Sequence, residues 1–398
     1  MLAPAEADAA IAASLAPLPV ERRRLADAAG AVLREDVHAE RDHPPFDRVA
    51  MDGIAVASAA WRAGRREFRI AGVQAAGAPP LRLEDADACV EAMTGAVLPP
   101  GADAVIPVER IEIARGVART AAGASAEPWQ HVHRRASDSR AGDRVLAAGT
   151  PLRAAEIAIV ASAGRAAVDV SRAPSVVVIS TGDELVEPGA PLADWQVRRS
   201  NAHAVVAALR MRAHASVVDD HLRDDPGQIA ERLAAHLARH DVVVLSGGVS
   251  AGRFDHVPRV LEELGVRRVF HRVAQRPGKP LWFGVAPGGR AVFGLPGNPV
   301  STLVCLVRYV LPALAHLAGA SPTPPLAVPL GAPWAAPEGL TSFLPVELAS
   351  VPGAATRAAP RPTRGSGDFG SLAGTAGFVE LAPGRDWRPG DAVPFHAW

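Results

Sequence analysis

The pattern of apolar and polar positions is clearest between residues 175 and 318, where short apolar runs alternate with helical stretches. Four consecutive apolar residues at 242–245, with no polar alternation, predict a strand buried on both faces of a parallel sheet. Further strands are expected at 176–179, 215–218, 269–273, 281–285 and 291–295, and helices at 200–211, at 226–239, before residue 265 and at 300–318. This alternation predicts an α/β fold with a parallel-type sheet.

The flanking parts of the chain have different patterns. We expect a helix at 5–16, stopped by two prolines, and a second helix at 21–34 from the spacing of its apolar residues. Residues 66–134 are typical of a β-rich region with Gly/Pro turns, and 153–163 predict a helix closed by Gly164. If the helical segments before residue 40 and after residue 150 pack together, the β-rich region is an insertion. After a proline-rich linker at 321–325, short β-like runs predict a small barrel or sandwich.

Composition narrows the function classes. A chain of 398 residues with 48% hydrophobic content can form two to four domains around sizeable cores. The 42 basic and 42 acidic residues balance, so nothing favours nucleic acid or an anionic membrane as partner. Two cysteines cannot build a disulfide framework or a cysteine zinc site, which predicts a reducing cytoplasm. The N-terminus lacks a signal-peptide pattern, and the apolar stretch 303–317 is too short to span a membrane.

Candidate chemistry gathers at the predicted strand ends. Segments 180–184, 224–225, 246–255 and 275–280 each combine small and charged residues after a strand, and 295–301 opens a helix. Consecutive βα units bring such ends to one rim of a sheet, so we expect one ligand site there. Glycine-loop amides and helix N-termini hold phosphate, and Arg276 and Lys279 add positive charge. A phosphorylated ligand is therefore favoured.

The same segments supply four acids, Asp183, Glu184, Asp224 and Asp255, whose oxygens suit Mg²⁺. The alternative is that these acids are helix caps and surface charge. That alternative is favoured for Asp224 or Asp225 taken singly, whereas the complete set favours a site. The sequence has neither a GxxxxGK[ST] loop nor a GxGxxG after a strand, so ordinary P-loop and nicotinamide enzymes fit poorly.

Two patterns outside the α/β region leave alternatives open. Asp47 and Asp52 flank a turn at Gly53, which fits a ligand site and a plain hairpin with solvated carboxylates equally well. His131 and His133 are predicted on one strand face. A metal pair there would lack a nearby third ligand, so a solvated or hydrogen-bonded face is favoured.

Seven ordered segments resemble the signature stretches of the molybdopterin molybdenumtransferases, the MoeA and gephyrin E-domain family. They are PPFDRVAMDGIAV (44–56), MTGAVLPPGADAVI (93–106), STGDEL (180–185), LRDDP (222–226), SGGVSAGRFD (246–255), RPGKP (276–280) and GLPGNPVS (294–301). The C-terminal GSGDFGSLAGTAGF (365–378) also resembles the last domain of that family. The similarity spans nearly the whole chain and is therefore far more specific than any single glycine loop.

The resemblance implies an elongated homodimer with four domains per chain. Residues 1–40 with 135–173 would form a linking domain, 41–134 an inserted β-rich domain, 174–322 the α/β molybdopterin-binding domain, and 323–398 a C-terminal β-barrel-like domain. The implied reaction inserts molybdate into the dithiolene of adenylylated molybdopterin, hydrolyses the adenylate and releases AMP, assisted by Mg²⁺ or another divalent cation. A molybdopterin adenylyltransferase and an acceptor molybdoenzyme are the implied protein partners.

The implied active site lies between the α/β domain of one subunit and the inserted domain of the other. By residue matching, the catalytic residues would be Asp52, Thr94, Asp138, Glu184 and Asp255. Glu184, Asp224 and Asp255 would hold the cation, and Arg276 and Lys279 would attract molybdate. The substrate-binding residues would be Ser180, Thr181, Gly182, Asp183, Gly247, Gly248, Ser250, Pro296, Gly297, Asn298 and Pro299.

The chain departs from the family pattern in three places. Val49 and Ile54 replace a serine and a tyrosine, Arg276 replaces a lysine, and 136–139 (ASDS) replaces a GED segment. The acids needed for the cation remain. The missing hydroxyls and lysine bear on efficiency or exact substrate, as in a divergent paralogue. Two alternative functions stay open: adenylylation of molybdopterin, and a non-catalytic scaffold that binds or delivers the cofactor.

Overall fold

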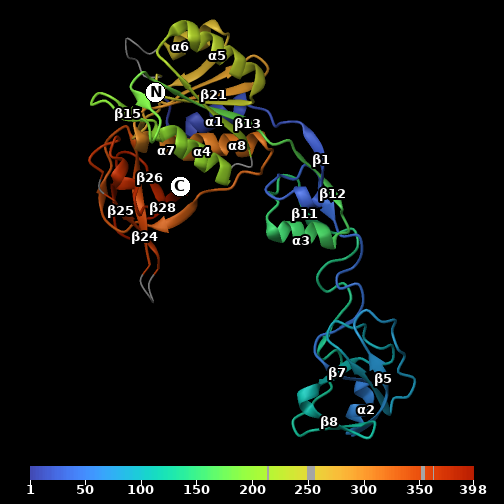
Figure 1. Cartoon of the computed structure of the whole chain (residues 1–398). Coiled ribbons are helices and arrows are strands. Elements are labelled where there is room, and N and C mark those ends of the chain that lie inside the picture. The colour runs from blue at the N-terminus through green and yellow to red at the C-terminus, as the bar shows by residue number, and fades with distance from the viewer. Residues whose placement is uncertain (213–214, 249–255, 351–354, 362) are drawn as a thin grey trace. The chain divides into compact units, whose positions relative to one another are not determined.

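A computed structural model describes residues 1–212, 215–248, 256–350, 355–361 and 363–398 (Figure 1). The contacts between residues define two compact units. The first unit contains residues 1–35, 148–153 and 167–398, and the second contains residues 36–147 and 154–166. The finer division into four domains stays a prediction.

A six-stranded sheet forms the centre of the first unit. Its order is β16 (Ser216–Leu222), β13 (Ser175–Thr181), β17 (Val242–Ser246), β21 (Arg290–Leu295), β20 (Trp282–Ala286) and β18 (Arg267–His271). The first four strands are parallel, and β20 runs antiparallel to both of its neighbours. Every residue of β17 is buried, as its uninterrupted apolar run predicts. The predicted α/β fold is confirmed, with β20 as the one reversed strand of this sheet.

Helices cover both faces of this sheet (Figure 1). Alternate residues of β13 point to opposite sides, so Val176 contributes to one apolar cluster and Val177 to the other. The first cluster includes α1 (Pro4–Ser14), α4 (Ser200–Arg212), α7 (Pro299–Cys305) and α8 (Leu311–Leu317), and the second includes α5 (Pro226–Arg239) and α6 (Val257–Glu263). A π-helical turn at Leu306–Val310 joins α7 to α8.

The helical run Pro299–Leu317 is 19 residues long and apolar enough to cross a membrane by length and composition. In this structure 67% of its most apolar window is buried inside the protein. The run therefore serves as a core helix of the first unit.

The C-terminal β region forms a second sheet of the first unit. The strands β24 (Thr341–Ala349), β26 (Gly377–Leu381), β28 (Ala392–Ala397) and β22 (Leu326–Pro329) follow one another, and β25 (Arg357–Pro360) pairs with β24. The short strand β19 (Gln275–Arg276), which comes from the α/β part, pairs in parallel with the start of β24. A separate ribbon joins β23 (Trp334–Ala335) to β27 (Asp386–Trp387). The small β fold predicted for this region is confirmed.

The predicted helix at 21–34 is wrong. Residues Val20–Arg24 form the strand β1, which pairs antiparallel with β12 (Ala167–Ser171), and only a 3-10 turn, Leu25–Asp27, follows. Exposed and half-buried residues alternate along β1, which suits a strand. Gly30 then adopts a φ of 81°, which ends any helical continuation. Long-range pairing with β12 therefore overrides a helix-like spacing of apolar residues.

The second unit is largely β-structure, as predicted. Its six-stranded sheet has the order β7 (Ala104–Pro107), β4 (Gly53–Val56), β6 (Ala88–Ala92), β5 (Glu67–Gln74), β9 (Val117–Thr120) and β8 (Ile111–Ala114). Two small ribbons pair β3 (Arg48–Val49) with β10 (Val132–His133) and β2 (Val37–His38) with β11 (Arg144–Leu146). The unit also contains α2 (Ser58–Arg62) and the predicted helix α3 (Ala154–Ser162).

Candidate functional site

Three of the predicted segments meet at the carboxyl ends of β13, β17 and β21. Ser180 pairs in register with Ser246, and Ser246 with Leu295, so the residues that follow these strands lie at one rim. The side-chain amide of Asn201 donates to the carbonyl of Gly297 at 2.6 Å and to Ser246 Oγ at 3.3 Å. Asn201 thus links the start of α4 to two of the strand ends.

The glycine pair after β17 lies close to the end of β13. Gly247 and Gly248 have φ angles of 92° and 66°, which favour glycine. A β-carbon on Gly248 would lie 2.5 Å from Thr181 Oγ1. Both the conformation and the close approach therefore require glycine at this position.

Two polar atoms at the rim have no hydrogen-bond partner among the described residues. They are Thr181 Oγ1 and Asn201 Oδ1, and both are buried. Buried polar atoms are usually paired, so unpaired ones at a rim of parallel strands suggest a ligand. The predicted residue Ser250 lies outside the described residues.

The predicted cation ligands are only partly described. The Asp183 backbone N–H lies 3.3 Å from Asp224 Oδ2, and the Asp224 backbone N–H lies 3.4 Å from Asp183 Oδ1, so these two acids lie together. Asp225 caps α5 by accepting from the Gln228 N–H at 2.8 Å, which confirms the capping alternative for that residue. Asp255 lies outside the described residues. Within the described ranges, no group of three or more acids, histidines or cysteines could hold a metal.

A buried arginine that no sequence motif marks holds the end of β13 in place. Arg199 is 5% exposed, and its Nε donates to Ser180 Oγ at 3.0 Å. The guanidinium also pairs with Asp219 at 2.7 Å and with Glu187. The hydrogen bond that Arg199 donates to Glu187 lowers the pKa of the Glu187 carboxyl. The segment that begins at Ser180 is therefore anchored to a neutralised internal charge.

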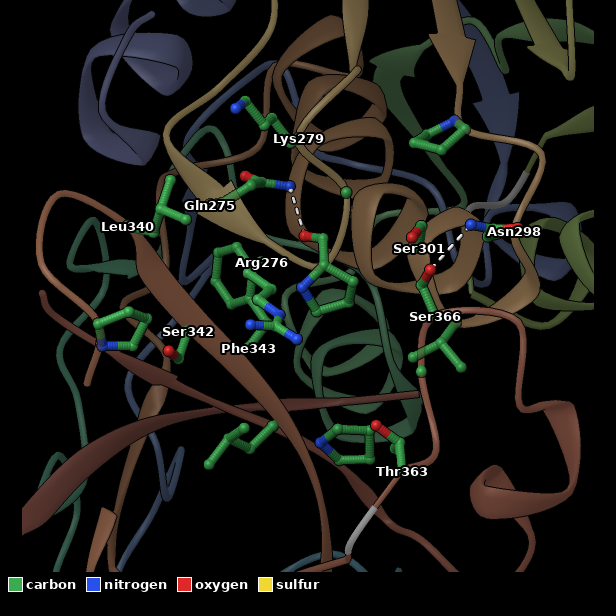
Figure 2. A pocket seen from close by; sticks show the side chains of 18 of the residues that line it. Gln275, Arg276, Lys279, Asn298, Ser301, Leu340, Ser342, Phe343, Thr363 and Ser366 are labelled. Carbon is green, nitrogen blue, oxygen red and sulfur yellow. Dashed lines mark hydrogen bonds between the residues drawn. The ribbon is translucent and has the colours of Figure 1, made fainter. Parts of the chain in front are cut away.

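A cleft of about 930 Å³ lies between the α/β part and the C-terminal β region. One wall is the segment Gln275–Pro280, and the other comes from β24 and from residues 360–361 and 363–366. Figure 2 shows Arg276 and Lys279 on the first wall and Ser342, Thr363 and Ser366 on the second. The described residues that line the cleft include four basic side chains, Arg276, Lys279, Arg361 and Arg364, and no acid.

The two predicted basic residues are free to act on a ligand. Both Arg276 and Lys279 are exposed to the cleft, and no carboxylate among the described residues forms a salt bridge with either. Arg361, in contrast, pairs with Glu347 at 3.0 Å. Asn298 closes one end of the cleft by donating to Ser366 Oγ at 2.8 Å. Uncompensated positive charge in a concave site favours an oxyanion.

In the second unit, the structure brings Asp52 and Thr94 together. Asp52 Oδ1 accepts hydrogen bonds from the Thr94 backbone N–H at 2.6 Å and from Thr94 Oγ1 at 2.7 Å. These two bonds lower the pKa of the Asp52 carboxyl. Asp47 instead accepts from the Arg135 backbone N–H at 2.8 Å, which gives it a structural role. The other predicted residue of this unit, Asp138, donates its backbone N–H to the His43 carbonyl at 2.9 Å.

The prediction that His131 and His133 share one strand face is wrong. His131 has a φ of 55° and lies before β10, so only His133 belongs to the strand. His131 Nε2 lies 3.3 Å from Gln130 Nε2, in keeping with the hydrogen-bonded alternative. Val49 and Ile54, which depart from the family pattern, are both buried.

Comparisons with known proteins match the chain in three consecutive parts. Residues 2–164 match the MoeA N-terminal region (domain I and II), residues 177–316 a probable molybdopterin binding domain, and residues 327–398 the MoeA C-terminal region (domain IV). A molybdopterin molybdenumtransferase of Synechocystis sp. is 40% identical over 371 residues, which cover 93% of each chain. One of Haemophilus influenzae is 36% identical over 76% of this chain and 74% of its own.

A solved structure gives the same result for the fold. The molybdopterin biosynthesis MoeA protein from Pyrococcus horikoshii superimposes with a TM-score of 0.76 and 29% identity. The superposition covers 100% of this chain and 99% of that protein.

Proposed function

Because this chain belongs to the MoeA family of molybdopterin molybdenumtransferases, we propose that it inserts molybdate into adenylylated molybdopterin and releases AMP. The chain is a transferase of molybdenum cofactor biosynthesis. The observation that carries the proposed chemistry is the basic cleft beside the rim of the sheet, whose described lining contains no acid. The reaction needs one surface that binds an oxyanion, which we assign to the cleft, and one that binds a nucleotide-linked pterin, which we assign to the rim.

We assign molybdate to the wall that carries Arg276 and Lys279. Neither cation is neutralised by a carboxylate of the described structure, so each is available for the oxygens of a doubly charged anion. Arg276 offers a planar fork of donors, and Lys279 acts as a compact charge. Arg364 raises the positive potential of the same cleft from the C-terminal side, whereas Glu347 balances the charge of Arg361.

The rim of the sheet is assigned to adenylylated molybdopterin. Thr181 Oγ1 and Asn201 Oδ1 supply polar atoms with no other described partner, and the Gly247-Gly248 backbone leaves room for close approach. The other proposed contacts are Ser180, Gly182, Asp183, Ser250, Pro296, Gly297, Asn298 and Pro299. Backbone amides at such strand ends favour phosphate groups.

A divalent cation, Mg²⁺ by its preference for oxygen, is proposed beside the phosphates. Glu184 and Asp224 would hold it, together with Asp255. The close pairing of Asp183 with Asp224 fits such an ion, because Mg²⁺ needs only one or two carboxylates when substrate phosphates complete its shell. Once bound, the ion would neutralise charge on the phosphates during cleavage. In the second unit, the lowered pKa keeps Asp52 ionised and able to orient water.

We further propose a cytoplasmic homodimer in which Asp52, Thr94 and Asp138 of one subunit complete the site of its partner. Similarity to the MoeA family supports this arrangement. The substrate would come from a molybdopterin adenylyltransferase, and the product would pass to an acceptor molybdoenzyme.

The test is to incubate the purified protein with adenylylated molybdopterin, with and without molybdate, and to measure AMP. Molybdate-dependent AMP release supports the proposal. Consumption of ATP with free molybdopterin would instead indicate adenylylation, and substrate binding without AMP release would indicate a scaffold. Asp52→Ala and Asp255→Ala should abolish turnover. Asp225→Ser, which keeps a helix cap, should leave it unchanged, and wild-type rates in both alanine variants would refute the site assignment.

A further inference from the structure

A group of buried polar side chains lies directly behind the wall that carries Arg276 and Lys279. Gln275 and Cys305 are fully buried, and Tyr309 is 1% exposed. Polar groups at such depth destabilise a fold unless they are hydrogen-bonded, so their contacts indicate what they do there.

Among the described residues, the side-chain hydrogen bonds of Gln275 lead to its own segment or to the helix behind it. Its Nε2 donates to the Pro277 carbonyl at 3.2 Å and to Cys305 Sγ at 3.5 Å, and its Oε1 accepts from the Tyr309 hydroxyl. Cys305 Sγ in turn donates to the Gly278 carbonyl at 3.6 Å. Burial raises the pKa of Tyr309, so its hydroxyl stays protonated and acts as a donor.

The segment alternates between the two sides of this wall. Gln275 and Gly278 are buried, whereas Arg276 and Lys279 are exposed and line the cleft. Gly278 has a φ of 94°, and a β-carbon on it would lie 2.5 Å from Gln275 Nε2 and 2.7 Å from Cys305 Sγ. The inward side therefore has no spare space, and the position of the segment follows that of the buried group.

The helix behind the wall is irregular at the point of contact. The π-helical turn Leu306–Val310 contains Tyr309 and begins directly after Cys305. Single π-turns within helices are rare and often occur at functional sites. This turn includes the residue whose hydroxyl bonds Gln275. The π-helical turn and the buried polar group therefore lie together behind the wall that carries Arg276 and Lys279.

We propose that Gln275, Tyr309 and Cys305 are positioning residues that set the geometry of Arg276 and Lys279 for the oxyanion. The inference rests on the function proposed above. A fully satisfied buried network specifies one arrangement, whereas apolar side chains of similar volume would fill the space without defining where the segment lies.

The first test separates affinity for the oxyanion from general damage. Gln275→Leu should raise the KM for molybdate about tenfold, as expected for losing a hydrogen bond that holds two charged groups. The KM for adenylylated molybdopterin and the kcat at saturating molybdate should change less than about twofold. Tyr309→Phe should act in the same direction by about threefold.

A matched control lies in the second unit. Gln74 is also fully buried, and its amide bonds three backbone carbonyls. Gln74→Leu should lower thermal stability but leave the molybdate KM at the wild-type value. A molybdate KM for Gln275→Leu within about twofold of wild type would overturn the inference.

The second test keeps every hydrogen-bonding group of the buried network. Tyr309 is the only tyrosine of the chain, so replacement by 3-fluorotyrosine gives one fluorine resonance. Molybdate should shift this resonance in a saturable manner, and chloride at equal ionic strength should not. An unchanged resonance at saturating molybdate would overturn the inference. If AMP release fails while the resonance still responds, the proposed function is wrong and the positioning of an oxyanion site stands.

Discussion

The rim of the sheet and the basic cleft differ in charge, although both include residues that follow β21. The rim carries Asp183 and Asp224 with glycines and unpaired polar atoms. The cleft contains four basic residues and no acid among its described lining. The rim thus suits phosphates together with a cation, and the cleft suits a bare oxyanion. Under the proposed function the two substrates bind to separate surfaces, so single variants should weaken the binding of one substrate and leave that of the other.

The largest effect is expected from removing both basic side chains of the cleft wall at 275–280. The double change Arg276→Ala and Lys279→Ala should raise the KM for molybdate about a hundredfold, because two charge-assisted contacts are lost. The KM for adenylylated molybdopterin should change far less. Arg259→Ala is the control, since Arg259 is an exposed residue of α6 that pairs only with Glu263 among the described residues. Equal loss of affinity for both substrates would show that the two surfaces are not separate.

The converse change affects the rim. Gly248→Ala should raise the KM for adenylylated molybdopterin about tenfold, because a β-carbon there meets Thr181 in a conformation that disfavours side chains. The molybdate KM should stay near the wild-type value. Gly189→Ala is a matched control, since Gly189 has a φ of 90° and nothing within 4 Å. A similar KM change in both variants would attribute the effect to backbone strain alone.

Ionic strength should change the KM for molybdate more than the KM for adenylylated molybdopterin, with a smaller effect than these substitutions. Raising it from about 0.05 to 0.5 M should increase the molybdate KM about threefold, because exposed charges such as Lys279 are screened. Binding at the rim should respond less, since its contacts include short-range hydrogen bonds. Steady-state kinetics in a series of chloride concentrations measures both constants. A steeper salt dependence for the pterin substrate would reverse the assignment.

The smallest effect is expected at acid pH. It involves Asp52, which belongs to neither the rim nor the cleft. The pKa of Asp52 is lowered by the Thr94 backbone and hydroxyl, so the carboxylate keeps its charge below the ordinary aspartate value of 3.8. Any stability linked to that charge is present above 3.8 and is lost as pH falls through the lowered pKa. Thr94→Val should move this pKa upward, which carboxyl-carbon NMR titration can follow. An unchanged titration would show that the hydroxyl contributes nothing.

Sequence alone could predict the parts that depend on local pattern. The apolar run at 242–245 fits only a doubly buried strand, and the segments after successive strands had to share a rim. The capping role of Asp225 also followed from Pro226 beside it. These features need no knowledge of distant contacts.

The features that the sequence did not predict depend on contacts between residues that are far apart in the chain. The segment 21–34 has a helix-like spacing, but pairing with β12 makes its first part a strand. The contributions of Arg361 and Arg364 to the cleft require β19 to join β24, across about 65 residues of chain. The roles of Arg199 and Asn201 likewise arise from partners 12 to 96 positions away. Val49 and Ile54 depart from the family pattern but are buried, so their change alters a core.

The parallel pairing of β19 with β24 bears on when the protein becomes competent during synthesis. Gln275 and Arg276 acquire a strand neighbour only from residues 341–342, and the far wall of the cleft needs residues up to 366. The α/β part can leave the ribosome and fold first, since chains fold progressively from their N-terminus. Until β24 has been made, the segment that carries Arg276 and Lys279 would be a strand edge without a neighbour. The proposed oxyanion site is therefore completed only after the C-terminal β region has been made, and a chain that ends before this region would lack the far wall of the cleft.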